Sequence, residues 1–365
     1  MSTSFTRHRR AMAIWLLTVC AMTFGMVILG GLTRLTHSGL SMTTWSFTGG
    51  LPPLTEAGWQ AEFARYQQFP EYQQLNQGMT LGGFKSIFWY EYSHRMLGRT
   101  IGSVYLFPFV FFAVRRAIPR WLLPRLVGLL CLLVMQGLVG WWMVRSGLVD
   151  RPDVSHLRLT THLGLAFAFE ASLWWVALSL IRDPSTTPVT GTRPLGWALF
   201  GATAMVYATA LLGGLVAGLD AGFSYNTFPL MGGKIVPAGY LALTPWWSNG
   251  LENIAAVQFN HRWMAIATLA TIAGLWLWSR RLPLAGDARR AMNGVLFVAG
   301  LQVSLGIVTL LSVVWLPVAS AHQACALLLM GTCLWAAHVV RHPRKGGAEI
   351  GTSGLQTVTM RSRGK

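Results

Sequence analysis

The sequence contains eight long apolar runs, each close to the roughly 20 residues that a helix needs to cross the hydrocarbon core of a membrane. They cover residues 11–33, 96–114, 122–144, 159–181, 195–218, 259–279, 291–314 and 318–340. Charged residues make up 11% of the 365-residue chain and apolar residues 53%, whereas soluble domains carry about 25% charged residues. We therefore expect an all-α integral membrane protein with eight transmembrane helices. The composition excludes an ordinary soluble domain and a disordered chain.

The basic residues are unevenly divided between the two ends of the predicted helices. Of the 29 Lys and Arg, 19 lie in the N-terminal segment, the even-numbered connections and the C-terminal segment, and 10 lie elsewhere. Cytoplasmic loops of membrane proteins carry an excess of Lys and Arg, so we expect both termini in the cytoplasm. Basic residues that set the membrane topology therefore explain the net charge of +17. No nucleic-acid partner is expected.

The sequence also shows an internal repeat. Residues 30–50 read GGLTRLTHSGLSMTTWSFTGG and residues 213–233 read GGLVAGLDAGFSYNTFPLMGG. Further pairs follow in the same order: His94-Arg95 with His261-Arg262, Gln136 with Gln302, Gly140 with Gly306, and His162 with His322. We expect two tandem four-helix bundles, residues 1–185 and 190–345, related as parallel repeats. Residues 346–365 are expected to form a disordered cytoplasmic tail.

Four histidines occupy matching places near the starts of the even-numbered predicted helices, namely His94, His162, His261 and His322. Polar side chains at membrane depth are costly and usually functional. Two imidazoles at one depth on facing helices suit the axial positions of a heme iron. Zinc is less consistent with the sequence, because no thiolate or carboxylate set completes a tetrahedron. The other five histidines are expected in outer loops (His37, His156) or solvated at cytoplasmic ends (His8, His338, His342).

The two halves differ beside the first histidine of each pair. The first half reads EYSHR where the second reads QFNHR, so Gln258 stands in place of Glu91. A carboxyl three residues before a ligand lies on the same helix face. The difference therefore predicts one catalytic and one non-catalytic heme site, with Glu91 as the catalytic residue. The adjacent Arg95 and Arg262 are candidates for binding heme propionates.

A second acid, Glu170, lies about 12 Å deeper along its helix than the histidine of the same run. We expect it to pair inside the protein, and a proton-relay role is the alternative.

Five segments resemble heme A synthases, most of all the type found in alphaproteobacteria and mitochondria: GGLTRLTHSGLSMTTW, EYSHRMLGR, GLDAGFSYNTFPLMGGKIVP, FNHR and AHQ. The resemblance covers about residues 11–340, and its most specific elements are NTFPLMGG and EYSHR. Some synthases carry cysteine pairs in their outer loops. The four cysteines of this chain all lie in apolar stretches, so no role for loop thiols is carried over.

The resemblance implies a reaction at the bacterial inner membrane. The ring-D methyl group of heme O is hydroxylated twice and loses water, which gives the formyl group of heme A for cytochrome oxidase. By the same resemblance, His94 and His162 hold the substrate heme O. The second pair, His261 and His322, holds a heme B cofactor. Glu91 acts at the first site, either by accepting a proton or by stabilising a cationic intermediate.

The resemblance leaves open whether heme O synthase and cytochrome oxidase assembly factors are partners, and whether the chain forms homo-oligomers. Two other functions also fit part of the pattern. A diheme cytochrome b that transfers electrons would use two histidine pairs, but it would not require the difference between Glu91 and Gln258. A transporter built of parallel repeats would explain the duplication, but not the histidine pairs.

Overall fold

The computed structural model describes residues 3–44, 50–149, 152–182 and 189–343. The predicted tail, residues 346–365, lies outside the described residues. Within the described ranges, eight helices are 25 residues or longer. They are α1 (Thr3–Leu35), α4 (Leu81–Val114), α5 (Leu123–Gly147), α6 (His156–Ile181), α7 (Arg193–Gly218), α9 (Ile254–Ser279), α10 (Gly286–Leu311) and α11 (Leu316–Arg341).

Seven of these helices are long and apolar enough to cross a membrane, so the chain is a multi-pass membrane protein. The eighth long helix, α9, has the same 26 residues as α10 and α11. It does not reach the hydropathy of the other seven, because Asn260, His261 and Arg262 follow one another within it.

The helices begin where the local sequence can cap them. Proline occupies the first turn of α5, α7 and α11, where its missing N–H would have no helical partner. In α4, the hydroxyl of Thr80 accepts a hydrogen bond from the Gly83 amide at 3.2 Å. The predicted start of this helix at residue 96 was therefore wrong. Residues 81–95 are helical too, but they include Lys, Glu, His and Arg, so they do not form part of an apolar run in the sequence.

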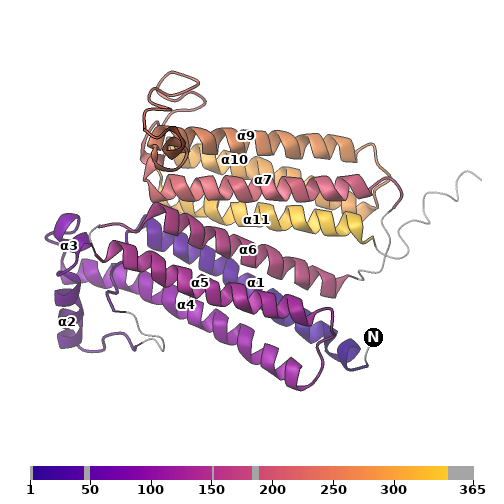
Figure 1. The fold of residues 1–365 in the computed structure, drawn as a ribbon, viewed down its shortest axis with the longest axis horizontal. Coiled ribbons are helices and arrows are strands. Elements are labelled where there is room, and N and C mark those ends of the chain that lie inside the picture. The colour runs from indigo at the N-terminus through magenta and orange to yellow at the C-terminus, as the bar shows by residue number, and fades with distance from the viewer. Residues whose placement is uncertain (1–2, 45–49, 150–151, 183–188, 344–365) are drawn as a thin grey trace, which may run out of the picture.

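The eight helices form two groups that lie side by side (Figure 1). One group comprises α1, α4, α5 and α6, and the other comprises α7, α9, α10 and α11. Helices α1 and α6 of the first group pack against α11 and α7 of the second. The start of α1 and the end of α11 lie at the same end of the molecule. Each group has its own cluster of buried apolar side chains.

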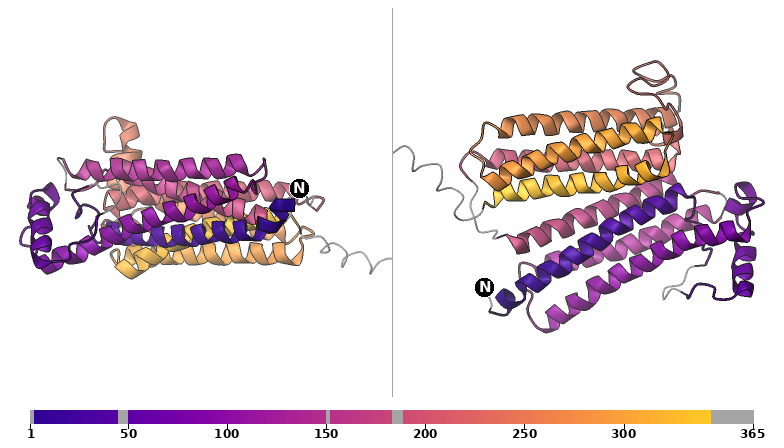
Figure 2. Two further views of the ribbon diagram at one scale, coloured as in Figure 1. Left: turned by 90° about the horizontal axis from the view of Figure 1, so that it is seen from below. Right: turned by 180° about the vertical axis from the view of Figure 1, so that it is seen from behind.

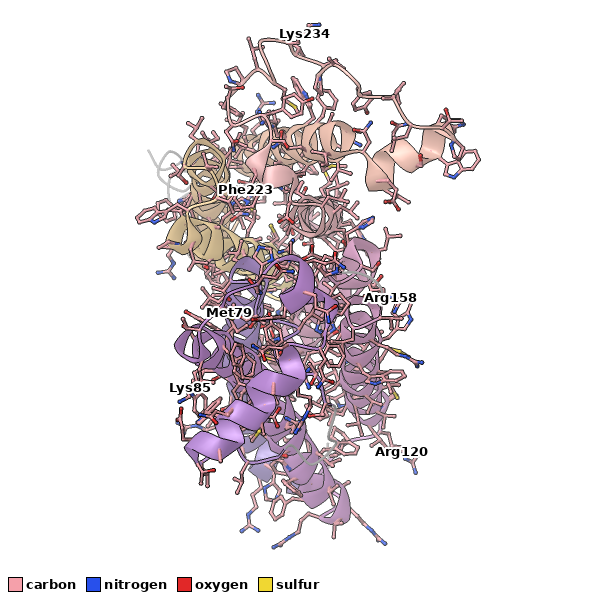
Figure 3. The ribbon with its side chains drawn as sticks, turned by 90° about the vertical axis from the view of Figure 1, so that its left-hand side faces the viewer. Met79, Lys85, Arg120, Arg158, Phe223 and Lys234 are labelled. Atoms are coloured by element: carbon pink, nitrogen blue, oxygen red, sulfur yellow. The ribbon has the colours of Figure 1, made fainter. Side chains whose placement is uncertain are left out.

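The opposite end carries the long connections, which fold into short helices as expected. These are α2 (Glu56–Tyr66), α3 (Pro70–Gln74), the 3₁₀ turns η1 (Ala221–Phe223) and η2 (Trp246–Ser248), and α8 (Asn249–Glu252). Figure 3 looks onto this end, with Met79 and Lys85 over the first group and Lys234 at the far edge of the second. Figure 2 shows from below and behind that α2 and α3 lie beyond the ends of most long helices, where α2 packs against the start of α4.

Several polar contacts join the groups near this end, among them an ion pair and an amide hydrogen bond. The guanidinium of Arg34 in α1 forms an ion pair with Asp220 at 2.9 Å. The amide of Gln323 in α11 donates to the carbonyl of Val27 in α1 at 2.8 Å. Because each contact links residues far apart in the chain, together they fix the two groups relative to one another where the candidate sites lie.

Candidate functional site

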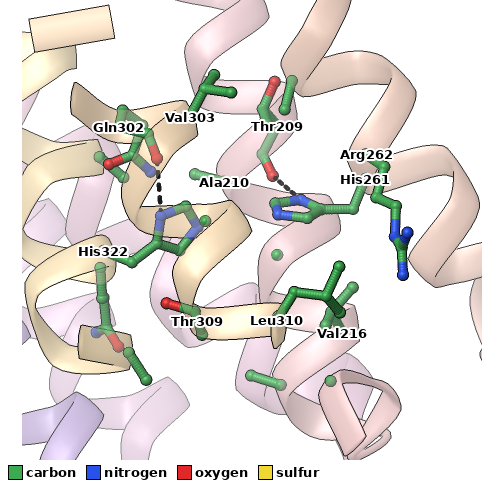
Figure 4. A pocket seen from close by; sticks show the side chains of 18 of the residues that line it. Thr209, Ala210, Val216, His261, Arg262, Gln302, Val303, Thr309, Leu310 and His322 are labelled. Carbon is green, nitrogen blue, oxygen red and sulfur yellow. Dashed lines mark hydrogen bonds between the residues drawn. The ribbon is translucent and has the colours of Figure 1, made fainter. Parts of the chain in front are cut away.

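Two predicted histidines face each other across a pocket in the second group of helices (Figure 4). His261 comes from α9 and His322 from α11. Their ring centres are 6.4 Å apart and their planes are at 89°. Apolar residues of α7, α9, α10 and α11 form most of the pocket wall, and Arg34 and Arg262 also line it.

Backbone carbonyls fix how each ring is presented. The Nδ1 atom of His261 lies 3.1 Å from the carbonyl oxygen of Thr209, and Nδ1 of His322 lies 3.1 Å from that of Gln302. A carbonyl oxygen only accepts hydrogen bonds, so each Nδ1 carries the proton and donates. Each Nε2 then has a free lone pair, as in histidines that ligate metals.

This geometry fits a metal held between two imidazoles. Two rings bound to one metal at about 2 Å have centres roughly 6 Å apart, which agrees with the observed 6.4 Å. Among the described residues, no three His, Cys, Asp or Glu side chains converge as a metal-binding group. A porphyrin supplies four nitrogen donors of its own, so two imidazoles at this separation suit its two axial positions.

Each of the four histidine rings packs against a glycine of a neighbouring helix. The pairs are His94 with Gly30, His162 with Gly140, His261 with Gly213, and His322 with Gly306. A methyl group at Gly306 would come within 2.8 Å of its histidine ring, and one at Gly140 within 2.9 Å. A side chain there would force the ring to move, so these glycines permit the observed ring positions.

The first pair, His94 and His162, is less firmly oriented. The amide of Gln136 donates to the carbonyl oxygen of His162 at 3.1 Å, and it lies 3.4 Å from Nε2 of the same residue. Nδ1 of His162 is buried and has no hydrogen-bond partner among the described residues. The first site therefore lacks the carbonyl contact that sets the tautomer of His322.

Glu91 is 2% exposed, and donors from the loop that follows α1 hold its carboxylate. One carboxylate oxygen accepts a hydrogen bond from the Ser41 hydroxyl at 2.7 Å and another from the Met42 amide at 2.6 Å. The other oxygen pairs with Arg95, one helical turn further along α4. Three donors hold this buried carboxyl group firmly in position.

Gln258 has the corresponding position in the second group but the opposite hydrogen-bond polarity. Its amide nitrogen donates to the carbonyl oxygens of Ala221 at 2.7 Å and Ser224 at 2.5 Å. Its oxygen accepts from Arg262 at 2.9 Å. The loop thus offers acceptors to Gln258, whereas the loop near Glu91 offers donors.

The two arginines make matching contacts as well. Arg95 donates to the carbonyls of Met42 and Thr44, and Arg262 donates to those of Tyr225 and Thr227. These contacts tie each helix to its outer loop, which the sequence did not predict. Nε of Arg262 is buried and has no hydrogen-bond partner among the described residues, so this guanidinium retains a free donor beside the pocket.

An aromatic cap covers the loop that holds Glu91. Trp59, Tyr66, Phe84 and Phe88 form a buried cluster against which Met42 packs. The Tyr66 hydroxyl donates to the buried carboxyl of Glu71 at 3.0 Å and accepts from Asn76 at 2.8 Å. Burial raises the pKa of Glu71 to about 8, and the nearby charges of Glu91 and Asp153 add to the rise, while the Tyr66 hydrogen bond opposes it.

Three expectations about other polar residues were wrong. His156 was expected in a loop, but it is the first residue of α6 and is 9% exposed. Glu170 does not pair inside the protein, since one of its carboxyl oxygens is buried without a hydrogen-bond partner among the described residues. His338 is not solvated: it is fully buried, and its ring packs edge-on against Trp175 at 4.9 Å. The errors for Glu170 and His338 arise because helices of the two groups pack together around these positions.

Comparison with known proteins agrees with this geometry. A family model described as cytochrome oxidase assembly protein (COX15-CtaA) matches residues 13–334. A heme A synthase from Rhodospirillum centenum is 50% identical over 337 residues, covering 92% of this chain and 89% of that protein. Heme A synthases from Nitrosospira multiformis and Parvibaculum lavamentivorans are 46% and 47% identical, each covering 91% of this chain and 94% of that protein. The chain belongs to the COX15-CtaA family of cytochrome oxidase assembly proteins.

Proposed function

We infer that the chain is a heme A synthase, an enzyme of heme A biosynthesis that serves cytochrome oxidase assembly. Family membership and the heme A synthase relatives support this function over the diheme cytochrome b alternative. The reaction proposed is oxidation of the ring-D methyl group of heme O to a formyl group. The observation that carries the proposal is the difference between the carboxylate of Glu91 and the amide of Gln258. The loop beside Glu91 donates hydrogen bonds to the carboxylate, and the loop beside Gln258 accepts hydrogen bonds from the amide.

The second histidine pair is proposed to hold heme B. The support is the 6.4 Å ring separation and the two carbonyl contacts that leave Nε2 free on His261 and His322. A heme bound there supplies an iron that changes oxidation state by one electron. The free donor of Arg262, with Arg34 on the same pocket wall, is placed to bind a propionate.

The first pair, His94 and His162, is proposed to hold the substrate heme O, with Glu91 as the catalytic residue. Oxidation of a methyl carbon releases protons and builds positive charge. A charged carboxylate near the reacting group accepts such a proton or stabilises such a charge. Ser41, Met42 and Arg95 keep the carboxylate in place, and Arg95 is further proposed to bind a propionate of the bound heme.

Eight membrane spans in two tandem four-helix bundles, residues 1–185 and 190–345, are proposed as the architecture. Matched contacts support the repeat: glycine against histidine four times, and arginine against two loop carbonyls twice. The basic residues near the shared end of α1 and α11 support an inner-membrane protein with both termini in the cytoplasm. Heme O synthase and oxidase assembly factors are proposed as partners, and homo-oligomers are compatible with the fold.

The test is co-expression with a heme O synthase in a bacterial host that makes no heme A. Chromatography of the extracted hemes should then show heme A, and purified protein should carry heme B. Extraction of heme B alone, with no heme A in the membranes, would support the diheme cytochrome instead.

A further inference from the structure

A second cavity lies between the two groups of helices, away from the histidine pairs. It has a volume of about 280 Å³ and is lined by α1, α6 and α11, close to the lower end of the range for small-molecule pockets. Figure 1 and the rear view of Figure 2 show α6 and α11 diverging toward the end that carries the start of α1. The cavity is partly open rather than enclosed, so a molecule dissolved in the membrane can approach it.

One carboxyl group stands out in this otherwise apolar cavity. Glu170 lies near the middle of α6 and lines the cavity with Cys20 of α1 and Thr332 of α11. One of its carboxyl oxygens is buried without a hydrogen-bond partner among the described residues. A buried polar atom without a hydrogen-bond partner destabilises the protein, because it has lost water without gaining a replacement. A ligand that hydrogen-bonds to this oxygen would remove this destabilisation.

Glu170 has no counterpart in the other half. The spacing that relates His162 to His322 relates Glu170 to Met330, which lines the same cavity. Packing of the bundle therefore does not require a carboxyl at this position, because the second half fills it with an apolar side chain. The acid is a feature of this cavity rather than of the repeat.

Two indole rings add aromatic faces to the site. Trp174 and Trp335 both line the cavity, and a hydrogen bond from Trp174 to the Gly331 carbonyl at 3.0 Å fixes the first ring. Flat rings pack well against indoles. The site thus combines apolar and aromatic walls with one carboxyl group, which lies about 12 Å deeper than the proposed heme ligand His162.

We propose that this cavity binds the ring of an isoprenoid quinone, with the Glu170 carboxyl hydrogen-bonded to a quinone oxygen. A carboxyl group accepts a hydrogen bond from a quinol hydroxyl and, when protonated, donates one to a quinone carbonyl. A lipid acyl chain offers no partner to Glu170, and phospholipid head groups stay at the membrane surface. An isoprenoid quinone carries a flat ring with oxygens into the depth of the bilayer.

The test measures binding of a short-tailed ubiquinone analogue to the purified full-length protein in lipid nanodiscs. Glu170→Leu should weaken binding about five- to tenfold, the effect of one lost hydrogen bond. Glu170→Gln, which keeps a donor and an acceptor, should stay within about twofold. Ala21→Phe, which fills the cavity from α1, should abolish binding. The control Met292→Leu changes a buried core residue of α10 away from the cavity and should leave binding unchanged.

A photoreactive azidoquinone should label α6 and α11, and Ala21→Phe should prevent the labelling. Equal affinity of Glu170→Leu and the unmodified protein would overturn the proposal, and so would full competition by a polyprenol that lacks the ring. Loss of the heme spectrum in Glu170→Leu would show that this variant is misfolded, and the test would then rest on Ala21→Phe. Unchanged quinone binding by Ala21→Phe would also overturn the proposal. Heme content reports separately on the proposed function, so the two ideas fail independently.

Discussion

Replacement of Glu91 by glutamine tests the catalytic proposal most directly. The substitution keeps the size of the side chain and removes its charge. In the structure, three donors surround the carboxylate: the Ser41 hydroxyl, the Met42 amide and the Arg95 guanidinium. A glutamine amide has one acceptor and one donor end, so its NH₂ group must face one of these donors.

The expected loss follows from these contacts. A hydrogen bond to a charged group contributes about 1.5–3 kcal/mol, and about 1.4 kcal/mol corresponds to a factor of ten. Loss of one such bond lowers the fraction of molecules in which the side chain at position 91 is correctly placed by about 10- to 100-fold. Loss of a general base or electrostatic stabiliser costs about 10²-fold or more. We therefore expect Glu91→Gln to make little or no heme A.

The assay is chromatography of hemes extracted from membranes of a host that supplies heme O. Glu91→Gln should retain heme B and heme O while heme A falls at least about 100-fold. Ser41→Ala is the graded control: it removes one donor and leaves the charge, so heme A should fall about tenfold. Accumulation of the alcohol intermediate would assign Glu91 to the second oxidation.

A near-normal yield of heme A from Glu91→Gln would refute the reasoning. It would remove Glu91 from the catalytic site and leave its three donors with a purely structural role. Loss of heme B from the same variant would also contradict the proposed division of labour, because Gln258 and its loop belong to the other site.

Three further predictions follow from other parts of the molecule. His261→Ala or His322→Ala should lose the Soret band of heme B, and a full heme B complement in both variants would contradict the proposed ligands. An alkaline phosphatase fusion after Arg341 should be inactive and a cytoplasmic reporter there active; an active phosphatase would reverse the proposed orientation. The pKa of Glu71 is raised from 4.5 to about 8 by burial, so its stabilising contribution is complete below about pH 4.5 and is lost as the pH rises through about 8. Hydrogen exchange in residues 56–76, corrected for intrinsic rates, should therefore increase toward pH 9, and Glu71→Gln should flatten this increase; equal pH profiles would show that Glu71 does not control the cap.

The sequence predicted the long helices well, because a membrane span requires a continuous apolar run. It failed where a helix continues beyond the hydrocarbon core, as α4 does between residues 81 and 95. The histidine positions followed from the repeat, but the contacts that orient them did not. Thr209 and Gln302 contribute backbone carbonyls, and every residue has one, so no residue type marks them in a sequence.

The surroundings of Glu91 were only partly visible in the sequence. Ser41 and Ser224 stand at equivalent places in the repeat, which marked the segment as significant. The sequence could not show that the first serine offers its hydroxyl and the second its carbonyl. That choice depends on how each loop folds back onto its helix, and the contacts span 34 to 50 residues.

The asymmetry of the two sites therefore belongs to a helix and its loop together. A carboxylate at position 91 is stabilised by donors from Ser41 and Met42, and an amide at position 258 by the carbonyls of Ala221 and Ser224. A glutamine at position 91 would place its NH₂ group against the donors of Ser41 and Met42 or of Arg95. A glutamate at position 258 would place a carboxylate against the carbonyl oxygens of Ala221 and Ser224. Either mismatch is buried and costs about 1–3 kcal/mol. Conversion of one site into the other would thus require changes in both the helix residue and its loop. If the two halves diverged from a common repeat, the same paired changes would have been needed.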